Sequence, residues 1–227
     1  MHRGSLSAFS IASRALVLSL AGLFLVLTPA TKGTAAELPC CGPISSQGQR
    51  LEAVLDSMNV ESLWLVRLHV NWETGKPDKA ADYEGPGTAT HCSAFAAAVG
   101  QKVGVYLLRP PEHTQVQLAN AQAEWFHNQQ AREAGWRSVD GPKQAQTLAN
   151  QGNLVVIAYE SPDPHRQGHV AIVRPAPRPQ KLLDESGPLI TQAGQKNYTR
   201  TSAKVGFQGH PGAWPAGVRY YMHPIEF

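Results

Sequence analysis

Hydrophobic residues recur at helical spacing in the first half of the chain and form short β-branched runs in the second half. Residues 49–58 (QRLEAVLDSM) carry such a pattern, with apolar positions at Leu51, Val54, Leu55 and Met58. The Ala-rich stretch that begins at Cys92 and the segments 114–130 and 143–150 predict three more helices. Residues 63–70 are expected to form a strand or another buried stretch.

The pattern changes after Gly152. The runs 153–159, 169–173, 189–193 and 218–222 are short, apolar and partly β-branched, which predicts strands. The turn Pro162-Asp163-Pro164 separates the first two of these runs. Helices followed by strands indicate an α+β domain, with N-terminal helices packed on a small antiparallel β-sheet.

Residues 1–36 differ from the rest of the chain. Basic residues precede an apolar run from Ala15 to Leu27, and small residues follow it up to Ala36. This order is typical of a secretory signal peptide cleaved after Ala36, although an uncleaved anchor remains an alternative. The apolar run of about 13 residues is shorter than the roughly 20 that a membrane helix needs, so we expect no stable membrane anchor. The sequence therefore predicts a secreted or periplasmic protein.

The remaining residues, 37–227, are enough for one domain with its own core. The whole chain has 20 Lys and Arg residues against 17 Asp and Glu residues, and three of the basic ones lie in the leader. The segment 37–227 is therefore formally neutral. It contains no basic run, which argues against a nucleic-acid partner. We expect a monomer.

The chain has three cysteines, an odd number for an exported protein. Cys40 and Cys41 are adjacent and could form a vicinal bridge or pair between molecules, which leaves Cys92 alone. A cysteine at a helix N-terminus is favoured as a thiolate because unpaired N–H groups stabilise negative charge. We therefore expect Cys92 to be partly exposed and acidic, and Thr90 to cap its helix. The alternative is a buried core cysteine without a catalytic role.

A histidine, His169, begins one of the predicted strands and could accept the thiol proton. Gln192 lies within the next predicted strand and could orient the imidazole through its second nitrogen, while Asn197 is a competing orienting residue. His165 and His169 are four residues apart, but the prolines and Gly168 around them argue against a helix and hence against a zinc pair. We predict neither a metal nor another cofactor.

These residues resemble a known family. Cys92-Ser93-Ala94-Phe95 and the later Gly168-His169-Val170-Ala171-Ile172-Val173 are similar to the NlpC-like and CHAP group of papain-like cysteine peptidases and amidases. The resemblance covers residues 92–192. It implies a papain-like fold, a nucleophile at Cys92, a base at His169 and an orienting residue at Gln192. It also implies that the substrate is an amide bond in the peptides of bacterial peptidoglycan.

Two other functions remain alternatives at this point. The domain could bind a cell-wall peptide without cutting it, or it could use the same Cys-His pair for acyl transfer to an amine or alcohol. A cognate inhibitor protein is a further partner compatible with a secreted wall hydrolase.

Overall fold

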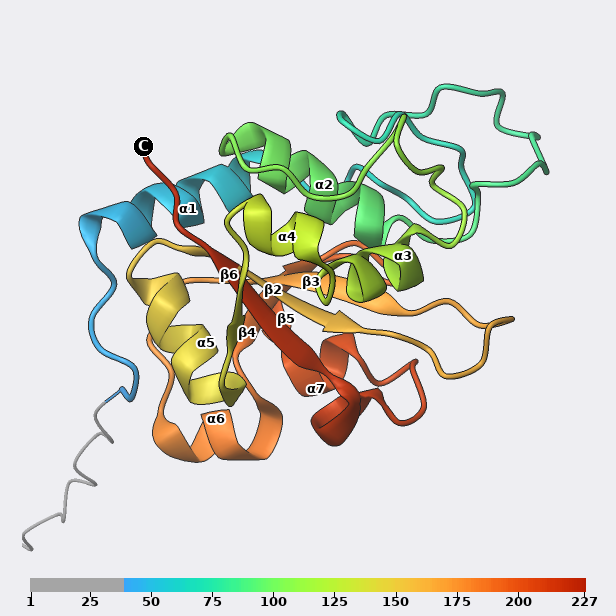
Figure 1. Ribbon diagram of the computed structural model, residues 1–227. Helices are drawn as coiled ribbons and strands as arrows, with labels where there is room; N and C mark the ends of the chain where they lie inside the picture. Colours follow the sequence, from blue (N-terminus) through green and yellow to red (C-terminus); the bar gives the residue numbers. More distant parts are fainter. Residues whose placement is uncertain (1–38) are drawn as a thin grey trace, which may run out of the picture. The chain divides into compact units, whose positions relative to one another are not determined.

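The computed structural model describes residues 39–227 (Figure 1). The predicted signal peptide, residues 1–36, lies outside the described residues. The elements in chain order are α1 (Ser46–Ser57), α2 (Cys92–Lys102), α3 (Leu118–Trp125), α4 (Gln129–Glu133), β1 (Arg137–Val139), α5 (Gly141–Asn150), β2 (Leu154–Tyr159), β3 (His169–Val173), α6 (Gln180–Ser186), β4 (Leu189–Gln192), β5 (Tyr198–Ser202), α7 (Ala203–Gly206), the π-helical turn η1 (Ala213–Gly217) and β6 (Arg219–His223).

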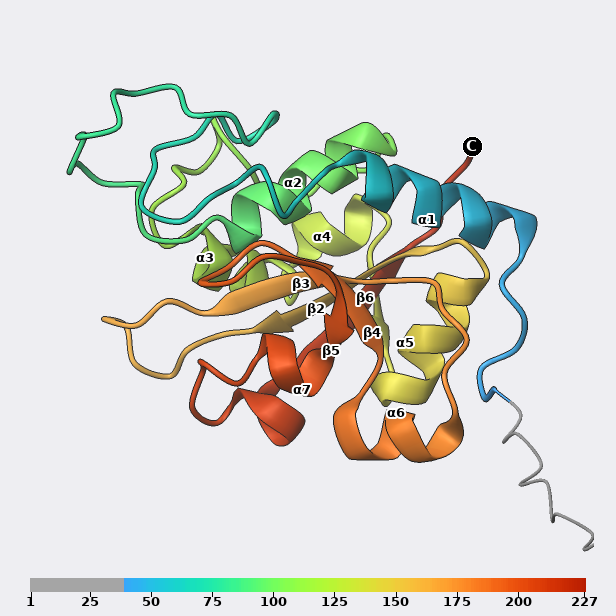
Figure 2. The same ribbon diagram turned by 180° about the vertical axis from the view of Figure 1, so that it is seen from behind.

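The strands form one six-stranded sheet in the order β1-β6-β2-β3-β4-β5, and every neighbouring pair is antiparallel. Helices cover both faces of this sheet (Figures 1 and 2). The helices α1 to α4 lie on one face, whereas α5, α6 and α7 lie on the other. This arrangement agrees with the predicted α+β class.

The two faces have separate hydrophobic cores. Val170 and Ile172 of β3 pack with Phe95 of α2 in the first core. Ala171 and Val173 of the same strand pack in the second core, which also contains Phe207. Every residue of β2 and β3 is buried, as expected for strands covered on both sides.

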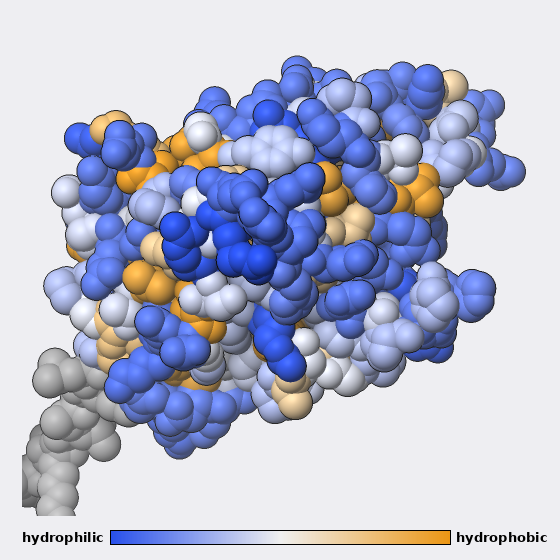
Figure 3. Space-filling view, viewed as in Figure 1, coloured by the Kyte–Doolittle hydropathy of each residue, from blue (hydrophilic) through white to orange (hydrophobic). Residues whose placement is uncertain are grey.

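The surface is mainly polar on the face shown in Figure 3, where hydrophobic residues form small, separate patches. Among residues 39–227, no helix is long and apolar enough to cross a membrane.

Most of the predicted elements are present. The helix predicted at 49–58 is α1, that at Cys92 is α2, and that at 143–150 is α5; the four predicted strands are β2, β3, β4 and β6. The helix predicted over 114–130 is divided into α3 and α4, because the Asn128 side chain accepts a hydrogen bond from Ala131 N–H and starts a new helix. Residues 63–70 form turns instead of a strand, since Trp64 and Arg67 both have a left-handed backbone. The alternative of a buried stretch holds only for Trp64 and Val70.

An ion-pair cluster fastens α1 to the sheet. The guanidinium of Arg174, which directly follows β3, is buried and lies 3.0 Å from Glu52 and 2.7 Å from Asp56, both on α1. Arg200 of β5 also contacts Glu52, at 2.7 Å. Within the described residues, Nε and Nη1 of Arg174 have no hydrogen-bond partner. The buried charge of Arg174 therefore depends on these two carboxylates.

We predict that the double variant Glu52→Gln/Asp56→Asn loses roughly 3 kcal/mol of unfolding free energy, because it leaves the Arg174 charge buried without a counter-ion. Urea denaturation monitored by circular dichroism measures the loss. The control is Glu185→Gln, which removes the exposed Lys181–Glu185 pair and should cost at most about 0.5 kcal/mol. Equal losses in the two variants would contradict the proposed role of the cluster.

Candidate active site

Cys92 is the first residue of α2, as predicted, but the start of the helix differs from the expectation. The N-cap residue is His91, which makes no side-chain capping bond and whose Nε2 lies 2.9 Å from the Leu68 carbonyl oxygen. Thr90 does not cap the helix. Its hydroxyl instead donates to Oε1 of Gln167, at 3.2 Å, which links the start of α2 to the loop before β3.

The Cys92 side chain is buried, with 2% of the residue exposed, which contradicts the expectation of a partly exposed thiol. Burial raises the pKa of the Cys92 thiol, since a thiolate is poorly solvated in the core. Interactions with the N–H groups of Val170 and Ser93 and with the Thr90 hydroxyl lower the pKa, but they do not offset the burial. The thiol is therefore neutral at neutral pH, and the expectation of an acidic cysteine is wrong.

His169 is the first residue of β3 and is almost fully buried. Its Nε2 lies 2.8 Å from Oε1 of Gln192 in β4, and its ring packs edge-on against Phe207 with the centroids 4.7 Å apart. Burial lowers the pKa of His169 to about 4, although the bond to Gln192 favours the protonated form. At neutral pH the imidazole is therefore neutral, so Nε2–H donates to Gln192 and Nδ1 is left as the basic nitrogen.

Of the two candidate orienting residues, Gln192 is the one that contacts the imidazole. Asn197 instead uses its amide nitrogen to donate to the carbonyl groups of Val60, Leu63 and Trp64, and its Oδ1 accepts a bond from Gly194 N–H. Asn197 therefore ties the β4–β5 turn to the segment after α1.

Cys92 and His169 approach β3 from different sides. Cys92 belongs to the core between α2 and the sheet, whereas the His169 ring lies with Phe207 on the opposite face. In the described part of the chain, no hydrogen bond joins the Cys92 sulfur to the imidazole. The link between them is the Val170 N–H, one residue after His169, which interacts with the sulfur.

Gly168, which precedes the histidine, has no room for a side chain. A Cβ at this position would lie 2.3 Å from the Tyr159 carbonyl oxygen and 2.4 Å from Oδ1 of Asn120. The close approach that glycine permits is thus made by β2 and α3 and not by the cysteine helix.

A cavity of about 650 Å³ opens beside His169 and Gln192. Its walls come from the β2–β3 loop, the β4–β5 turn and the segment after α7, and Thr90 also lines it. Cys92 itself does not. A second cavity of about 580 Å³ shares Ala89 and Gln195 with the first. The two cavities are therefore neighbours.

His210 is a cavity residue that sequence analysis missed. Its ring is stacked on that of His169, with centroids 4.7 Å apart and ring planes 13° apart. It lies in an irregular segment rich in glycine and proline, where no periodic pattern marks a functional side chain.

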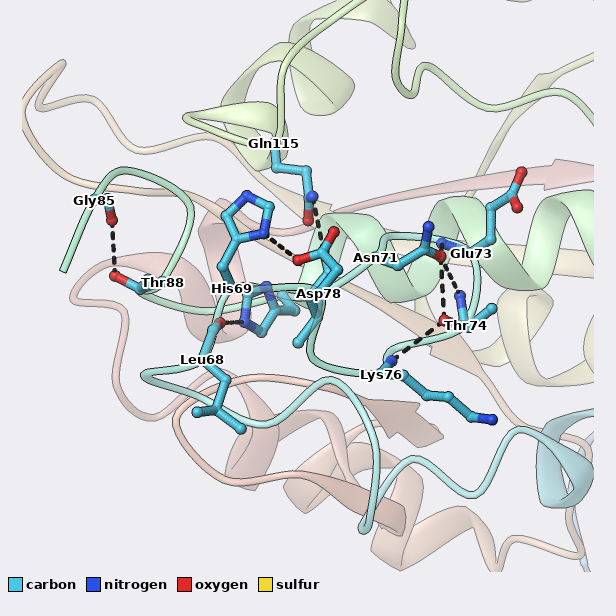
Figure 4. A network of polar contacts seen from close by, with 12 residues as sticks. Leu68, His69, Asn71, Glu73, Thr74, Lys76, Asp78, Gly85, Thr88 and Gln115 are labelled. Atoms are coloured by element: carbon cyan, nitrogen blue, oxygen red, sulfur yellow. Dashed lines mark hydrogen bonds and ion pairs between the residues drawn. The ribbon is translucent and has the colours of Figure 1, made fainter. Parts of the chain in front are cut away.

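His69 belongs to a network of local polar contacts. His69 Nδ1 is 2.5 Å from Oδ1 of Asp78, and Figure 4 shows the two side chains facing each other in the loop that precedes α2. In the same loop, Oδ1 of Asn71 accepts bonds from Glu73 N–H and Thr74 N–H (Figure 4). His69 therefore fastens this loop. The described residues contain no group of three or more side chains suited to hold a metal ion.

No protein-family model matches the chain, and no curated protein matches it either. The chemistry of the site therefore has to be inferred from its own residues.

We predict that iodoacetamide labels Cys92 of the native protein at pH 7.5 at least about tenfold more slowly than in the unfolded chain, because the sulfur is buried and its raised pKa reduces the thiolate fraction. Labelling should accelerate as the pH rises above the ordinary thiol range, near 8.5. Peptide mapping by mass spectrometry measures both rates. Native labelling as fast as that of the unfolded chain would contradict the buried, neutral thiol.

Proposed function

We propose that the protein is an exported cysteine amidase or peptidase of the papain-like NlpC/CHAP type, acting on amide bonds in the peptides of bacterial peptidoglycan. The observation that carries the proposal is the hydrogen bond between His169 and Gln192 at the wall of the cavity. In the same strand as His169, the Val170 N–H interacts with Cys92, which lies at the N-terminus of α2. The signal-peptide pattern in residues 1–36 supports export to the periplasm or the exterior.

In this mechanism substrate binding first has to bring the Cys92 sulfur and the His169 ring together, because the structure places them on opposite sides of β3. The neutral thiol then transfers its proton to His169 as the sulfur attacks the carbonyl carbon of the amide. The carbonyl π bond opens to give a tetrahedral oxyanion. When it collapses, the C–N bond breaks and the protonated imidazole gives its proton to the leaving amine. A thioester on Cys92 remains. Water then attacks the thioester with His169 as base, which releases the carboxylic acid and restores the thiol.

Gln192 has a positioning role in this proposal. Its Oε1 accepts the proton of Nε2, which leaves Nδ1 as the nitrogen that takes the thiol proton. A neutral amide does this without adding charge to a buried site, so the pKa of His169 stays low. Substrate binding has to uncover the sulfur, and the Thr90–Gln167 hydrogen bond lies between the start of α2 and the cavity where the substrate would enter.

One observation favours the binding-only alternative, namely the burial of Cys92. A protein that only holds a wall peptide in the cavity has no need of an accessible thiol. The two functions differ in the effect of removing the sulfur, since binding alone does not require it.

We predict that residues 37–227 release soluble fragments with new amino groups, and no new reducing sugar ends, from isolated sacculi. Mass spectrometry of the fragments identifies the bond. The Cys92→Ala and His169→Ala variants should release none, whereas His165→Ala, at an exposed residue outside the cavity, should retain activity. Reducing ends alone would contradict an amidase. Retention of sacculi without release would favour the binding-only alternative, and fragments joined to an added amine would favour acyl transfer.

We predict different effects for the two amides near His169. Gln192→Ala should lower the turnover number, by as much as about 10⁴-fold if it acts like the orienting residue of a catalytic triad, with little change in melting temperature. Asn197→Ala should lower the melting temperature, because three carbonyl groups lose their donor, while turnover in the cold stays close to that of the unmodified protein. Thermal melts and wall-digestion rates measure the two effects. The opposite pattern would make Asn197 the orienting residue.

A further inference from the structure

The stacked imidazoles of His169 and His210 form a second arrangement at the candidate site. His210 is half-buried and borders the cavity, while His169 is buried beneath it. Phe207 packs edge-on against the His169 ring, and Tyr159 packs edge-on against the His210 ring, at a centroid distance of 6.3 Å. The His169 ring is thus held by Gln192 at one nitrogen, by Phe207 at an edge and by His210 across a face.

His210 is also connected to the start of α2. It hydrogen bonds to the backbone of Gln167, two residues before His169, and the Gln167 side chain accepts the bond from Thr90. Its own backbone is fixed by bonds from His210 N–H to the Phe207 carbonyl oxygen and from Ala213 N–H to the His210 carbonyl oxygen. The ring is therefore placed by the same loop that carries His169 into the sheet.

Two positive imidazolium rings at this distance repel each other, and neither is well solvated. Burial and, to a smaller extent, the charge of His169 lower the pKa of His210 to about 4, while its hydrogen bond to the Gln167 backbone opposes the shift. The other charged or titratable groups that line the cavity beside the pair are Tyr159, Asp163 and Arg166 from β2 and its loop, and Lys196 and Tyr198 from the β4–β5 region. Cys92 lies on the other side of β3. Asp163, the carboxylate that lines the cavity, is paired with Arg166 at 3.6 Å. It is therefore not free to stabilise a positive charge on both imidazole rings at once.

We propose that His210 is a positioning residue that holds the His169 ring by stacking and limits the two imidazoles to one shared positive charge. In the proposed hydrolase, this arrangement keeps His169 neutral and ready to accept the Cys92 proton. After proton transfer, the positively charged His169 ring is stabilised by Gln192 but not by His210. The proton therefore passes readily from His169 to the leaving amine. The catalytic consequence rests on the proposed function, whereas the stacking and the shared charge do not.

The test compares His210→Phe, which keeps an aromatic ring but cannot be protonated, with His210→Ala, which removes both properties. Histidine-selective NMR titration of the mature chain measures the pKa of His169 without any need for activity. In the unmodified protein the two rings should titrate as a coupled pair. In His210→Phe, His169 should titrate alone in a single step and keep its low pKa. In His210→Ala the ring is uncovered, and the pKa of His169 should rise towards 6.5.

Wall digestion over a range of pH provides the second measurement. His210→Ala should lower the turnover number about 10- to 100-fold with little change in KM, and move the acid limb of the pH profile upwards. His210→Phe should restore most of the rate and the acid limb, and the control His165→Ala should match the unmodified protein. If His210→Ala does not fold, the comparison of His210→Phe with the unmodified protein decides the question through the loss of the coupled titration step.

An unchanged pKa of His169 in His210→Ala, or independent titration of the two rings in the unmodified protein, would overturn the inference. A coupled titration in a protein that releases nothing from sacculi would overturn the proposed hydrolase and leave the imidazole pair standing. The two failures are therefore distinguishable.

Discussion

The alternation of side chains along β3 determines what each neighbouring element can contribute to the candidate site. Because successive residues of a strand point to opposite faces, Val170 and Ile172 pack towards α2 while His169, Ala171 and Val173 point towards α7. The ring of His169 is therefore enclosed by Gln192 of β4 and by Phe207 after α7, whereas Cys92 on the other side contacts the backbone of Val170 and not the imidazole. A shift of one residue in register would exchange these two environments.

Burial and helix polarity act in opposite directions on Cys92, and burial dominates. A helix N-terminus stabilises an anion by roughly 0.3 to 1 kcal/mol at an exposed site. Removing a charged group from water costs considerably more when few polar groups replace the solvent. The same competition acts on His169, where one amide oxygen cannot replace the lost hydration. Both Cys92 and His169 are thus neutral at neutral pH.

The sequence predicted the helices and strands better than the burial and packing of individual side chains. Helical spacing located α1, α2 and α5, and β-branched runs located β2 and β3, since these signals depend on neighbours along the chain. Strand periodicity also placed Gln192 within reach of His169. In contrast, β5 (YTRTS) is polar and was missed, because it is a strand only through pairing with β4. The burial of Cys92 and the stacking of His210 depend on contacts between distant segments, which no local pattern encodes.

The outermost strands of the sheet affect how this chain meets other chains. β1 has only three residues, and β5 places the exposed Arg200 on the other border, beside the register shift between Ile190 and Gln192 of β4. Short, charged or irregular borders are poor templates for strand addition, because an approaching chain finds few aligned N–H and C=O groups and has to bury a charge. The ion pair from Arg200 to Glu52 therefore has a second consequence besides holding α1. It keeps a cation fixed at the border where intermolecular β-pairing would otherwise begin.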